Sequence, residues 1–459
     1  MAAIDSGDVA VSAEGWVANQ NSAAAFDDQV FLRVFYLDEG GERMGSLESV
    51  SGSGESWTLR ALEAGLPPGT RALEVEVGGL YRHGIANEST VDAVSLMLWQ
   101  RTPEPATITL APMLQDHHTD QMMILWETDR ADEPARIEWG ADGVVASIST
   151  TQVADDHYVH RGTITGLSSG TPVDYRVCVG ATCGEVYRFT SAPGAGAPVR
   201  IGWLADNQDN LESVFEIHID HLRDKAPDML IMAGDIVQDV AELEEWSRLW
   251  WRPLTDGGIG SSVPVMIARG NHDKEHPYAH AYAAMPGNGS WYSFRYGDIF
   301  FVVLDSNHSA SATQTFENQQ VFLLGALKTS DALAAAFRVV VFHDAPFNSI
   351  VTATKSSWGW EDAQEELVPL FADNGVDLVV AGHYHSYQRG ERDGVRYVVI
   401  GGGGASLLGD EVGGPYEEMW AHVESSWHYS VMDADQSGLT WTTYGVDDAP
   451  IDSFTIAPR

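Results

Sequence analysis

The sequence has very little lysine and very little positive charge of any kind. Its 459 residues include only four lysines, and 26 Lys and Arg against 66 Asp and Glu give a formal net charge of −40. Without a basic stripe to neutralise phosphates, nucleic-acid scaffolds and anionic membrane surfaces are excluded as partners. A diffuse acidic excess with almost no lysine favours adaptation to high salt, where screening removes the self-repulsion. An acidic protein adapted to ordinary salt is the alternative interpretation.

Long apolar runs and a leader sequence are also missing. No run approaches the roughly 18 residues of a membrane span. The opening segment, MAAIDSGDVAVSAEG, has neither the basic nor the apolar region of a signal peptide. We therefore expect either a cytoplasmic protein or a chain that begins after a removed leader. Disorder is excluded because 44% of the residues are hydrophobic, and the length suggests about three domains of roughly 150 residues.

Cysteine is scarce, with Cys178 and Cys183 in the segment YRVCVGATCGEVYRF. The two residues flank a glycine-containing turn between strand-like runs, so a disulfide across a hairpin is sterically allowed. Two free thiols are the equally weighted alternative. A zinc site is disfavoured because two thiolates supply only two of four ligands.

Three regions with different patterning follow one another along the chain. Residues 1–104 alternate apolar and polar positions between GG, SGSG and LPPGT turns, which predicts a jelly-roll-like β-sandwich. Such a module either binds a glycan or acts as a spacer, and both interpretations stay open. Residues 105–193 contain about six or seven short strands, which predicts an immunoglobulin-like or fibronectin III-like sandwich. The small-residue stretch APGAGAP (192–198) is a predicted hinge.

Residues 198–459 alternate short apolar runs with helix-length amphipathic stretches, the pattern of an α/β domain with a buried sheet. The clearest predicted helices are 211–226 and 357–375, the latter ending at Gly375. Five apolar runs end in potential metal ligands: Asp206 and Gln208, then Asp235, then Asn271 and His272, then His343, then His383 and His385. The carboxyl ends of strands in such sheets meet at one edge, where ligands bind. A mixed oxygen and nitrogen set of this size suits two divalent ions.

The order of these motifs resembles the calcineurin-like metallophosphoesterases, whose pattern is D-x-(H), G-D-x-x, G-N-H-D, a lone H and G-H-x-H. The segments SWYSFRYGDIFFVVLDSN (290–307), FHDAPFNS (342–349), GHYHSYQRG (382–390) and 427–456 are similar to the purple acid phosphatase branch. LAPMLQDHHTDQMMILWET resembles the start of that branch's fibronectin-like N-terminal domain. The resemblance covers 198–459 well, leaves 1–104 outside, and implies a four-layer α/β/β/α catalytic domain.

The resemblance also implies a ligand set: Asp206 and His385 for one ion, Asp235 as a bridge, and Asn271, His343 and His383 for a second ion. Two dications near 4 Å apart need a shared anion, and a hydroxide held between them would attack phosphorus in line. His272 is expected to contact the phosphate or to protonate the leaving oxygen. Asp273 would orient the His272 ring, unless it is an exposed turn acid.

Two departures from the family pattern bear on the metals. Gln208 stands where the family has a metal-binding histidine, and Gln238 where the purple branch has its colour-giving tyrosine. A neutral amide oxygen suits hard ions, so among Mn, Mg, Ca, Zn and Fe we expect the first site to bind weakly or to favour Mn, Mg or Ca. An iron(III)-containing pair is disfavoured, and the protein should not be purple. Whether Asp239 compensates or faces solvent stays open.

Several other clusters invite a functional interpretation. The run Asp116–Asp120 (DHHTD) looks metal-like, but we expect a solvated turn of the second region. His276 and His280 are expected at the surface or behind the ligands. Gly401–Gly404 lacks the lysine and helix of a phosphate cradle, so it is interpreted as a closely packed turn.

The sequence thus predicts a three-domain, secreted or periplasmic metallophosphoesterase that hydrolyses small-molecule phosphomonoesters. Phosphodiester hydrolysis is the alternative within the class. A catalytically inactive binding protein, attached to a glycan through residues 1–104, is the alternative outside it.

Overall fold

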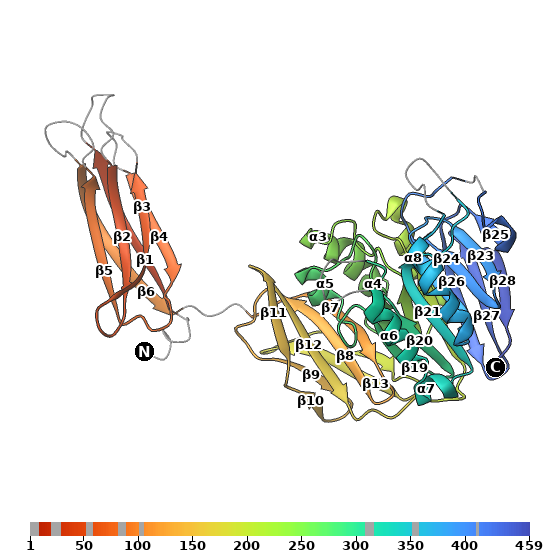
Figure 1. Ribbon diagram of the computed structural model, residues 1–459. Coiled ribbons are helices and arrows are strands. Elements are labelled where there is room, and N and C mark those ends of the chain that lie inside the picture. Colours follow the sequence, from red (N-terminus) through yellow and green to blue (C-terminus); the bar gives the residue numbers. More distant parts are fainter. Residues whose placement is uncertain are drawn as a thin grey trace. The chain divides into compact units, whose positions relative to one another are not determined.

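The computed structural model describes residues 9–19, 29–51, 58–80, 89–100, 105–307, 316–350, 358–409 and 413–459. The chain divides into two compact units, Met1–Glu104 and Pro105–Arg459 (Figure 1). The boundary between them coincides with the end of the first predicted region. Among the described residues, no helix combines the length and apolar character needed to cross a membrane.

The first unit consists of two three-stranded antiparallel sheets in its described part. One sheet has the order β4-β1-β6 (Thr58–Gly65, Val9–Asn19, Ser89–Gln100) and the other β3-β2-β5 (Arg43–Ser51, Gln29–Leu37, Ala72–Leu80). Ala13 of one sheet packs with Leu32 and Val34 of the other, so the apolar positions of the alternating pattern face a shared core. The jelly-roll type stays a prediction.

Residues 105–193 also form two sheets. Their orders are β11-β12-β8-β7 (Ser149–Ala154, His157–Thr165, Gln121–Thr128, Ile108–His117) and β10-β9-β13-β14 (Gly143–Val145, Ala135–Trp139, Pro172–Val179, Thr182–Cys183), with β15 (Tyr187–Thr190) paired to β13. Trp126, Ile137 and Tyr175 lie in the core between them. The Tyr175 hydroxyl donates to the Ser261 carbonyl oxygen at 2.8 Å, which ties this sandwich to the rest of its unit. The fibronectin III type stays a prediction.

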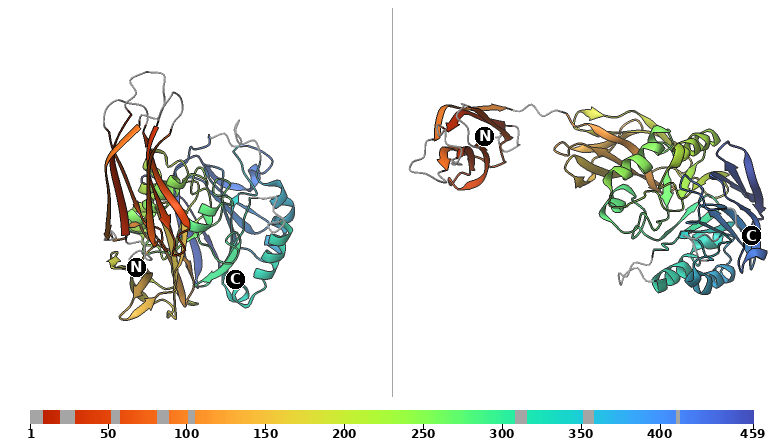
Figure 2. Two further views of the ribbon diagram at one scale, coloured as in Figure 1. Left: turned by 90° about the vertical axis from the view of Figure 1, so that its left-hand side faces the viewer. Right: turned by 90° about the horizontal axis from the view of Figure 1, so that it is seen from above.

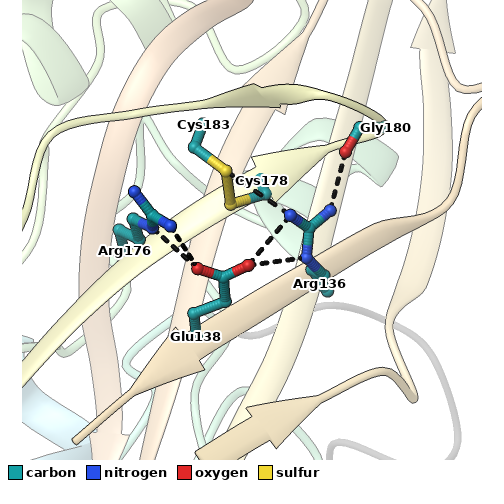
Figure 3. Close-up of a disulfide and its surroundings, with 6 residues drawn as sticks. All are labelled: Arg136, Glu138, Arg176, Cys178, Gly180 and Cys183. Carbon is teal, nitrogen blue, oxygen red and sulfur yellow. Dashed lines mark hydrogen bonds and ion pairs between the residues drawn. A yellow bond between two sulfur atoms is a disulfide. The ribbon is translucent and has the colours of Figure 1, made fainter. Parts of the chain in front are cut away.

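Cys178 and Cys183 form a disulfide, which resolves the alternative between bonded and free thiols (Figure 3). The two residues are directly opposed across β13 and β14. Beside them Glu138 accepts hydrogen bonds from Arg136 at 2.9 Å and from Arg176 at 2.7 Å. Glu138 therefore pairs with arginines, and the two bonded sulfurs are not thiolate ligands for a metal.

The remaining residues contain two large mixed sheets. The six-stranded sheet has the order β18-β17-β16-β26-β27-β28 (Val265–Ile267, Met229–Met232, Val199–Leu204, His428–Asp435, Gly438–Gly445, Pro450–Ile456). The seven-stranded sheet has the order β19-β20-β21-β22-β24-β23-β25 (Tyr292–Tyr296, Ile299–Val303, Phe337–Asp344, Leu378–Gly382, Val395–Ile400, Tyr387–Arg392, Trp420–Glu424). Strands β16–β18 are mutually parallel, as are β20, β21, β22 and β24.

Side-chain alternation places these sheets face to face with helices outside. Trp203 of β16 stacks towards Phe301 of β20, 6.2 Å between ring centroids, while its neighbour Gly202 faces Leu222 of helix α2 (Val214–Lys225). The next residue of β20, Val302, faces a second core formed with α6 (Phe316–Ala326), α7 (Ser330–Ala334), α8 (Glu361–Glu366) and α9 (Val368–Asp373). Figure 2 shows these four helices together on one outer face. The arrangement is helix, sheet, sheet, helix, as the resemblance implies.

Both predicted helical segments are helical, but each is divided into two elements. The 211–226 segment begins with a 3-10 turn, η1 (Leu211–Ser213), before α2. The described part of the 357–375 segment is divided into α8 and α9, because Pro369 lacks an amide hydrogen and interrupts the helical bonding. Gly375 has φ 63° directly after the last turn, the left-handed position predicted for it. Shorter elements are the continuous run α3, η2 and α4 (Leu243–Glu245, Trp246–Trp251, Arg252–Asp256), α5 (Pro277–Tyr282) and η3 (Glu417–Met419).

Candidate metal centre

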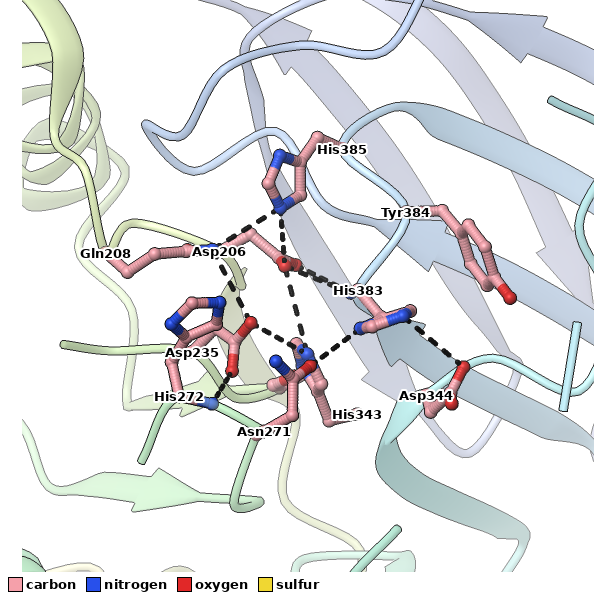
Figure 4. Close-up of polar contacts among 12 residues, drawn as sticks. Asp206, Gln208, Asp235, Asn271, His272, His343, Asp344, His383, Tyr384 and His385 are labelled. Carbon is pink, nitrogen blue, oxygen red and sulfur yellow. Dashed lines mark hydrogen bonds and ion pairs between the residues drawn. The ribbon is translucent and has the colours of Figure 1, made fainter. Parts of the chain in front are cut away.

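The structure brings the seven predicted metal ligands together at the carboxyl ends of parallel strands (Figure 4). Asp206, Asp235 and Asn271 follow β16, β17 and β18 of the six-stranded sheet, whereas His343 lies in β21 and His383 directly follows β22. The ligands therefore come from two facing sheets rather than from one. Parallel pairing is what aligns the strand ends on each side.

Three of these residues have left-handed backbone conformations that non-glycine residues rarely adopt. Asp206 has φ 60°, Asp235 has φ 55° and His383 has φ 69°. Each such conformation costs of the order of 1–3 kcal/mol and persists only where its surroundings enforce it. The sharp turns aim all three side chains towards one point, and the main-chain N–H of His383 donates to Asp206 Oδ2 at 2.9 Å.

One half of the centre contains Asp206, Gln208 and His385. His385 Nε2 lies 3.3 Å from Asp206 Oδ1 and 3.4 Å from Gln208 Nε2. Gln208 Nε2 also lies 3.5 Å from Asp235 Oδ2. The oxygen of the Gln208 amide is buried and has no hydrogen-bond partner among the described residues. A cation bound in the cluster would satisfy this unpaired oxygen acceptor.

The other half contains Asn271, His343 and His383. Asn271 Oδ1 lies 2.8 Å from His383 Nδ1, and His343 Nε2 lies 3.1 Å from Asp235 Oδ2. Asp235 Oδ2 thus contacts both halves, His343 on one side and Gln208 on the other. This is the place a bridging carboxylate would occupy between two ions.

Two of these distances, His385 Nε2–Asp206 Oδ1 at 3.3 Å and His343 Nε2–Asp235 Oδ2 at 3.1 Å, fit ligand pairs on divalent ions. Two ligands held at about 2.1 Å from one ion, at angles between 90° and tetrahedral, lie about 3.0–3.4 Å apart. The second ring nitrogen is held by a carbonyl in two of the histidines: His343 Nδ1 donates to Ala233 at 2.8 Å and His385 Nδ1 to Ser406 at 2.6 Å. That contact fixes the ring with its other nitrogen, an electron-pair donor, directed into the cluster.

The cluster is strongly negative for a buried site. Asp206 and Asp235 are 0% and 1% exposed. Burial would lower the pKa of His343, but the charges of Asp235 and Asp206 outweigh it and raise that pKa to about 10. Burial, followed by the charge of Asp235, raises the pKa of Asp273 to about 8. Buried carboxylates that draw protons onto their neighbours would draw metal cations equally.

His272 and Asp273 lie beside the cluster, but not in the relation predicted from the sequence. Asp273 is buried and accepts the main-chain N–H groups of Asp235 at 2.8 Å and Gly270 at 3.1 Å. It therefore joins the two ligand loops and is neither an exposed turn acid nor the partner of the His272 ring. That ring is oriented by a main-chain carbonyl, because His272 Nδ1 donates to Gln238 O at 2.6 Å.

Gln238, where the family pattern is broken, and its neighbour Asp239 face outward. Gln238 and Asp239 are exposed, and their main-chain N–H groups donate to Glu245 at 2.9 and 2.7 Å. The carboxylate of Asp239 accepts the N–H of Ala241, closing a turn. The contacts of Asp239 in the described structure therefore give no support for a compensating ligand.

Two site neighbours escaped sequence reasoning. Asp344 Oδ1 lies 4.0 Å from His383 Nε2, and the buried Tyr384 packs edge-on against the His383 ring. Both directly follow predicted ligands in the sequence, and that adjacency was the available signal. Strand alternation gives no support to that signal, since successive side chains normally point to opposite faces.

The other histidines considered in the sequence analysis contact side chains or main chain outside the metal centre. His117 is buried against Phe294 and Tyr296, so the expectation of a solvated turn is wrong for this residue. His276 accepts the N–H of Tyr278 at the start of α5, and His280 pairs with Glu275.

The glycine run is a closely packed turn, as predicted. A Cβ atom on Gly401, Gly402 or Gly403 would lie 2.3, 2.1 and 2.3 Å from Tyr384 O, His428 Nδ1 and Ala205 O, respectively. The N–H of Gly403 donates to Ala205 O at 2.9 Å. The run therefore braces the loops that carry Asp206 and His385.

Comparison with known proteins agrees with this geometry. Residues 199–387 match the family "Calcineurin-like phosphoesterase". Purple acid phosphatase 18 of Arabidopsis thaliana is 23% identical over 75% of this chain and 82% of its own length, and purple acid phosphatase 15 is 26% identical over 54% and 53%. The match to purple acid phosphatase 15 thus spans about half of that relative's length. Another Arabidopsis relative, 25% identical over 39% of this chain and 35% of its own length, is named "Probable inactive purple acid phosphatase 24".

Solved structures show the same fold. The purple acid phosphatase PPD1 of yellow lupin aligns over 98% of this chain and 90% of its own, with 18% identity and a TM-score of 0.67. PhoD aligns over 78% and 90%, with 12% identity and a TM-score of 0.56. The family match and the site geometry together define a metallophosphoesterase domain within this chain. Residues 199–387 are similar to calcineurin-like phosphoesterases, and purple acid phosphatases are among the relatives of the chain.

Proposed function

We propose that this chain hydrolyses phosphomonoesters at a centre of two divalent metal ions. The observation that carries the proposal is the convergence of the predicted ligand set around Asp235 Oδ2, which faces both halves of the cluster. In this proposal, one ion would be held by Asp206, Gln208 and His385. The other ion would be held by Asn271, His343 and His383. When bound, two such ions acidify water and offset charge on the phosphoryl oxygens.

The residues of the chain then supply position and proton transfer. His272 Nδ1 is occupied by Gln238 O, so Nε2 is the ring atom left to contact a phosphate or, when protonated, a leaving oxygen. The main-chain N–H of His272 donates to Asp235 Oδ1 at 2.8 Å, which fixes the histidine relative to the bridging carboxylate. General acid catalysis of this kind contributes about 10²–10⁴ in rate.

The test combines metal analysis with kinetics on nitrophenyl phosphate. The chelator-treated chain is reloaded with Mn, Mg, Ca, Zn or Fe, and hydrolysis is compared for the wild type, Asp235→Asn and His272→Ala. We expect Asp235→Asn to lose bound metal, and His272→Ala to keep its metal while kcat falls about 10²–10⁴-fold. Asp239→Asn is the matched control, an exposed carboxylate near Asp235 with no site contact. Wild type without metal-dependent hydrolysis under any of these ions would overturn the proposal.

The same assay distinguishes phosphodiester hydrolysis from phosphomonoester hydrolysis. Faster turnover of bis(nitrophenyl) phosphate than of the monoester would replace the monoesterase by a phosphodiesterase on the same centre. An inactive binding protein is favoured only by Gln208 and Gln238, where the family pattern is broken. It predicts no metal-dependent turnover of either ester.

We also propose that the chain works in a secreted or periplasmic location. The Cys178–Cys183 disulfide supports this, since disulfides persist in oxidising compartments. Glycan binding by the first unit stays a prediction from its sequence pattern, because the buried Phe35 ring is covered by the Arg43 guanidinium, 3.4 Å from the ring centroid, and offers no free face for a sugar. Binding of the wild type to a glycan array tests it directly.

A further inference from the structure

The ring of His383 is surrounded on three sides. Its Nδ1 faces Asn271 Oδ1 at 2.8 Å, which is the metal side of the ring in the proposed centre. Tyr384 and His343 pack edge-on against it, with ring centroids 5.0 and 5.2 Å away. The remaining ring nitrogen, Nε2, faces Asp344 Oδ1 at 4.0 Å (Figure 4).

An irregularity in β21 brings Asp344 to this place. Val341 pairs with Val380 and Asp344 with Gly382, so three steps along β21 match two along β22. One extra residue in a strand re-aims the side chains that follow it. Phe342 still faces the outer core and His343 the metal cluster, while Asp344 comes to lie opposite the residue before His383. Its main-chain N–H is anchored to Ser306 Oγ at 3.0 Å.

We propose that Asp344 is a positioning residue for metal binding, which holds the proton of His383 on Nε2 and leaves Nδ1 as an electron-pair donor. The inference rests on the proposed function, because it assigns Nδ1 to the second ion. His343 and His385 have carbonyl oxygens in the equivalent role, whereas a carboxylate serves His383. A contact of 4.0 Å is closed by a small side-chain rotation or by one bridging water. A carboxylate at this position also makes the imidazole a stronger donor.

The experiment measures metal affinity directly. Chelator-stripped wild type, Asp344→Ala and Asp344→Asn are titrated with Mn²⁺ and with Zn²⁺ against a competing chelator dye. Loss of such an outer partner costs about 10–100-fold in metal affinity. We expect that loss for one of two ions in Asp344→Ala, and recovery to within about threefold in Asp344→Asn, whose amide oxygen still accepts a hydrogen bond. Asp209→Ala is the matched control, an exposed carboxylate whose side-chain hydrogen bond in the described part of the chain is to Ser406 rather than to a ligand side chain.

A spectroscopic readout separates positioning from loss of charge. In ¹H–¹⁵N spectra of the Zn²⁺-loaded protein, with His383 assigned by comparison with His383→Gln, the Nε2–H proton should be shifted downfield by its carboxylate partner in the wild type, and that shift should be lost in Asp344→Ala. Equal affinities for Asp344→Ala and Asp209→Ala, or an unchanged Nε2–H shift, would overturn the inference while leaving the proposed hydrolysis intact. Affinity loss in a chain that hydrolyses no ester would support the inference and overturn the proposed function. Wild type that binds neither ion would overturn both.

Discussion

Acid stability should be limited by a histidine remote from the metal ligands. His117 is 1% exposed, and neither ring nitrogen has a hydrogen-bond partner among the described residues. Burial, with the neighbouring charge of His118, lowers the pKa of His117 from 6.5 to about 3. The folded protein therefore keeps this ring neutral at pH values where the unfolded chain protonates it.

The sign and size of the effect follow from proton linkage. Between pH 6.5 and about 3 the unfolded state binds more protons at this position, so the free energy of unfolding falls as the pH falls through that window. Each pH unit well below 6.5 costs about 1.4 kcal/mol, and integration from pH 6.5, where the unfolded histidine is half protonated, to pH 4.5 gives about 2.3 kcal/mol. A His117→Phe variant keeps the aromatic contacts with Phe294 and Tyr296 and removes the titration. Its stability relative to wild type should rise by about that amount on acidification.

The assay is urea unfolding of wild type and variant at pH 7.5, 6.5, 5.5 and 4.5, following the transition of the second unit. His118→Phe is the matched control with the opposite sign. Asp116 raises the pKa of the half-exposed His118, so this histidine stabilises the fold at acid pH and the contribution is lost as the pH rises. The His118→Phe variant should therefore lose stability relative to wild type as the pH falls from 7.5 towards 6.5, whereas the His117→Phe variant should gain stability relative to wild type below pH 6.5. Parallel stability curves for wild type and His117→Phe would refute the reasoning.

Three further predictions concern metals and salt. Gln208→His should raise the affinity for Zn²⁺ relative to Mn²⁺ by at least about tenfold in competition titrations, since imidazole replaces an amide oxygen; an unchanged ratio would show that Gln208 does not touch the ion. The iron-loaded wild type should lack an intense visible charge-transfer band, because Gln238 stands in place of a phenolate, and a purple solution would contradict this. With a net charge of −40, kcat/KM for an anionic ester should rise as NaCl increases from 10 to 150 mM, where the Debye length shortens from about 30 to 8 Å. A fall in kcat/KM would indicate a positive approach to the site.

The clustering of the candidate ligands could be predicted because strand ends and ligand types are both local properties of the sequence. A short apolar run followed by Asp206 or Asp235 fixes the place of a carboxylate at the end of a parallel strand. The disulfide could only be left open, because sequence spacing allows a bond without requiring one. Direct opposition of Cys178 and Cys183 across two strands is a matter of register, which the structure supplies.

What sequence reasoning missed depends on main-chain contacts between distant segments. The partner of His272 is the carbonyl of Gln238, a group that every residue carries and that no side-chain pattern marks. The role predicted for Asp273 was wrong for the same reason. Its carboxylate accepts hydrogen bonds from the main-chain N–H groups of Asp235 and Gly270. Asp344 was passed over because regular alternation turns it away from His343, and the register irregularity in β21 is invisible in the sequence.

The acidity of the chain acts in two physically different ways. Most of the carboxylates in the described part of the chain face solvent, where counter-ions screen each of them within about 8 Å at physiological salt. Asp206 and Asp235 are almost completely buried, so salt cannot screen them, and the proton drawn onto His343 shows how strongly they attract positive charge. The surface excess therefore determines how the protein responds to ionic strength. In the proposed function, the buried pair would attract the metal cations, and an anionic ester would reach them after crossing the screened surface.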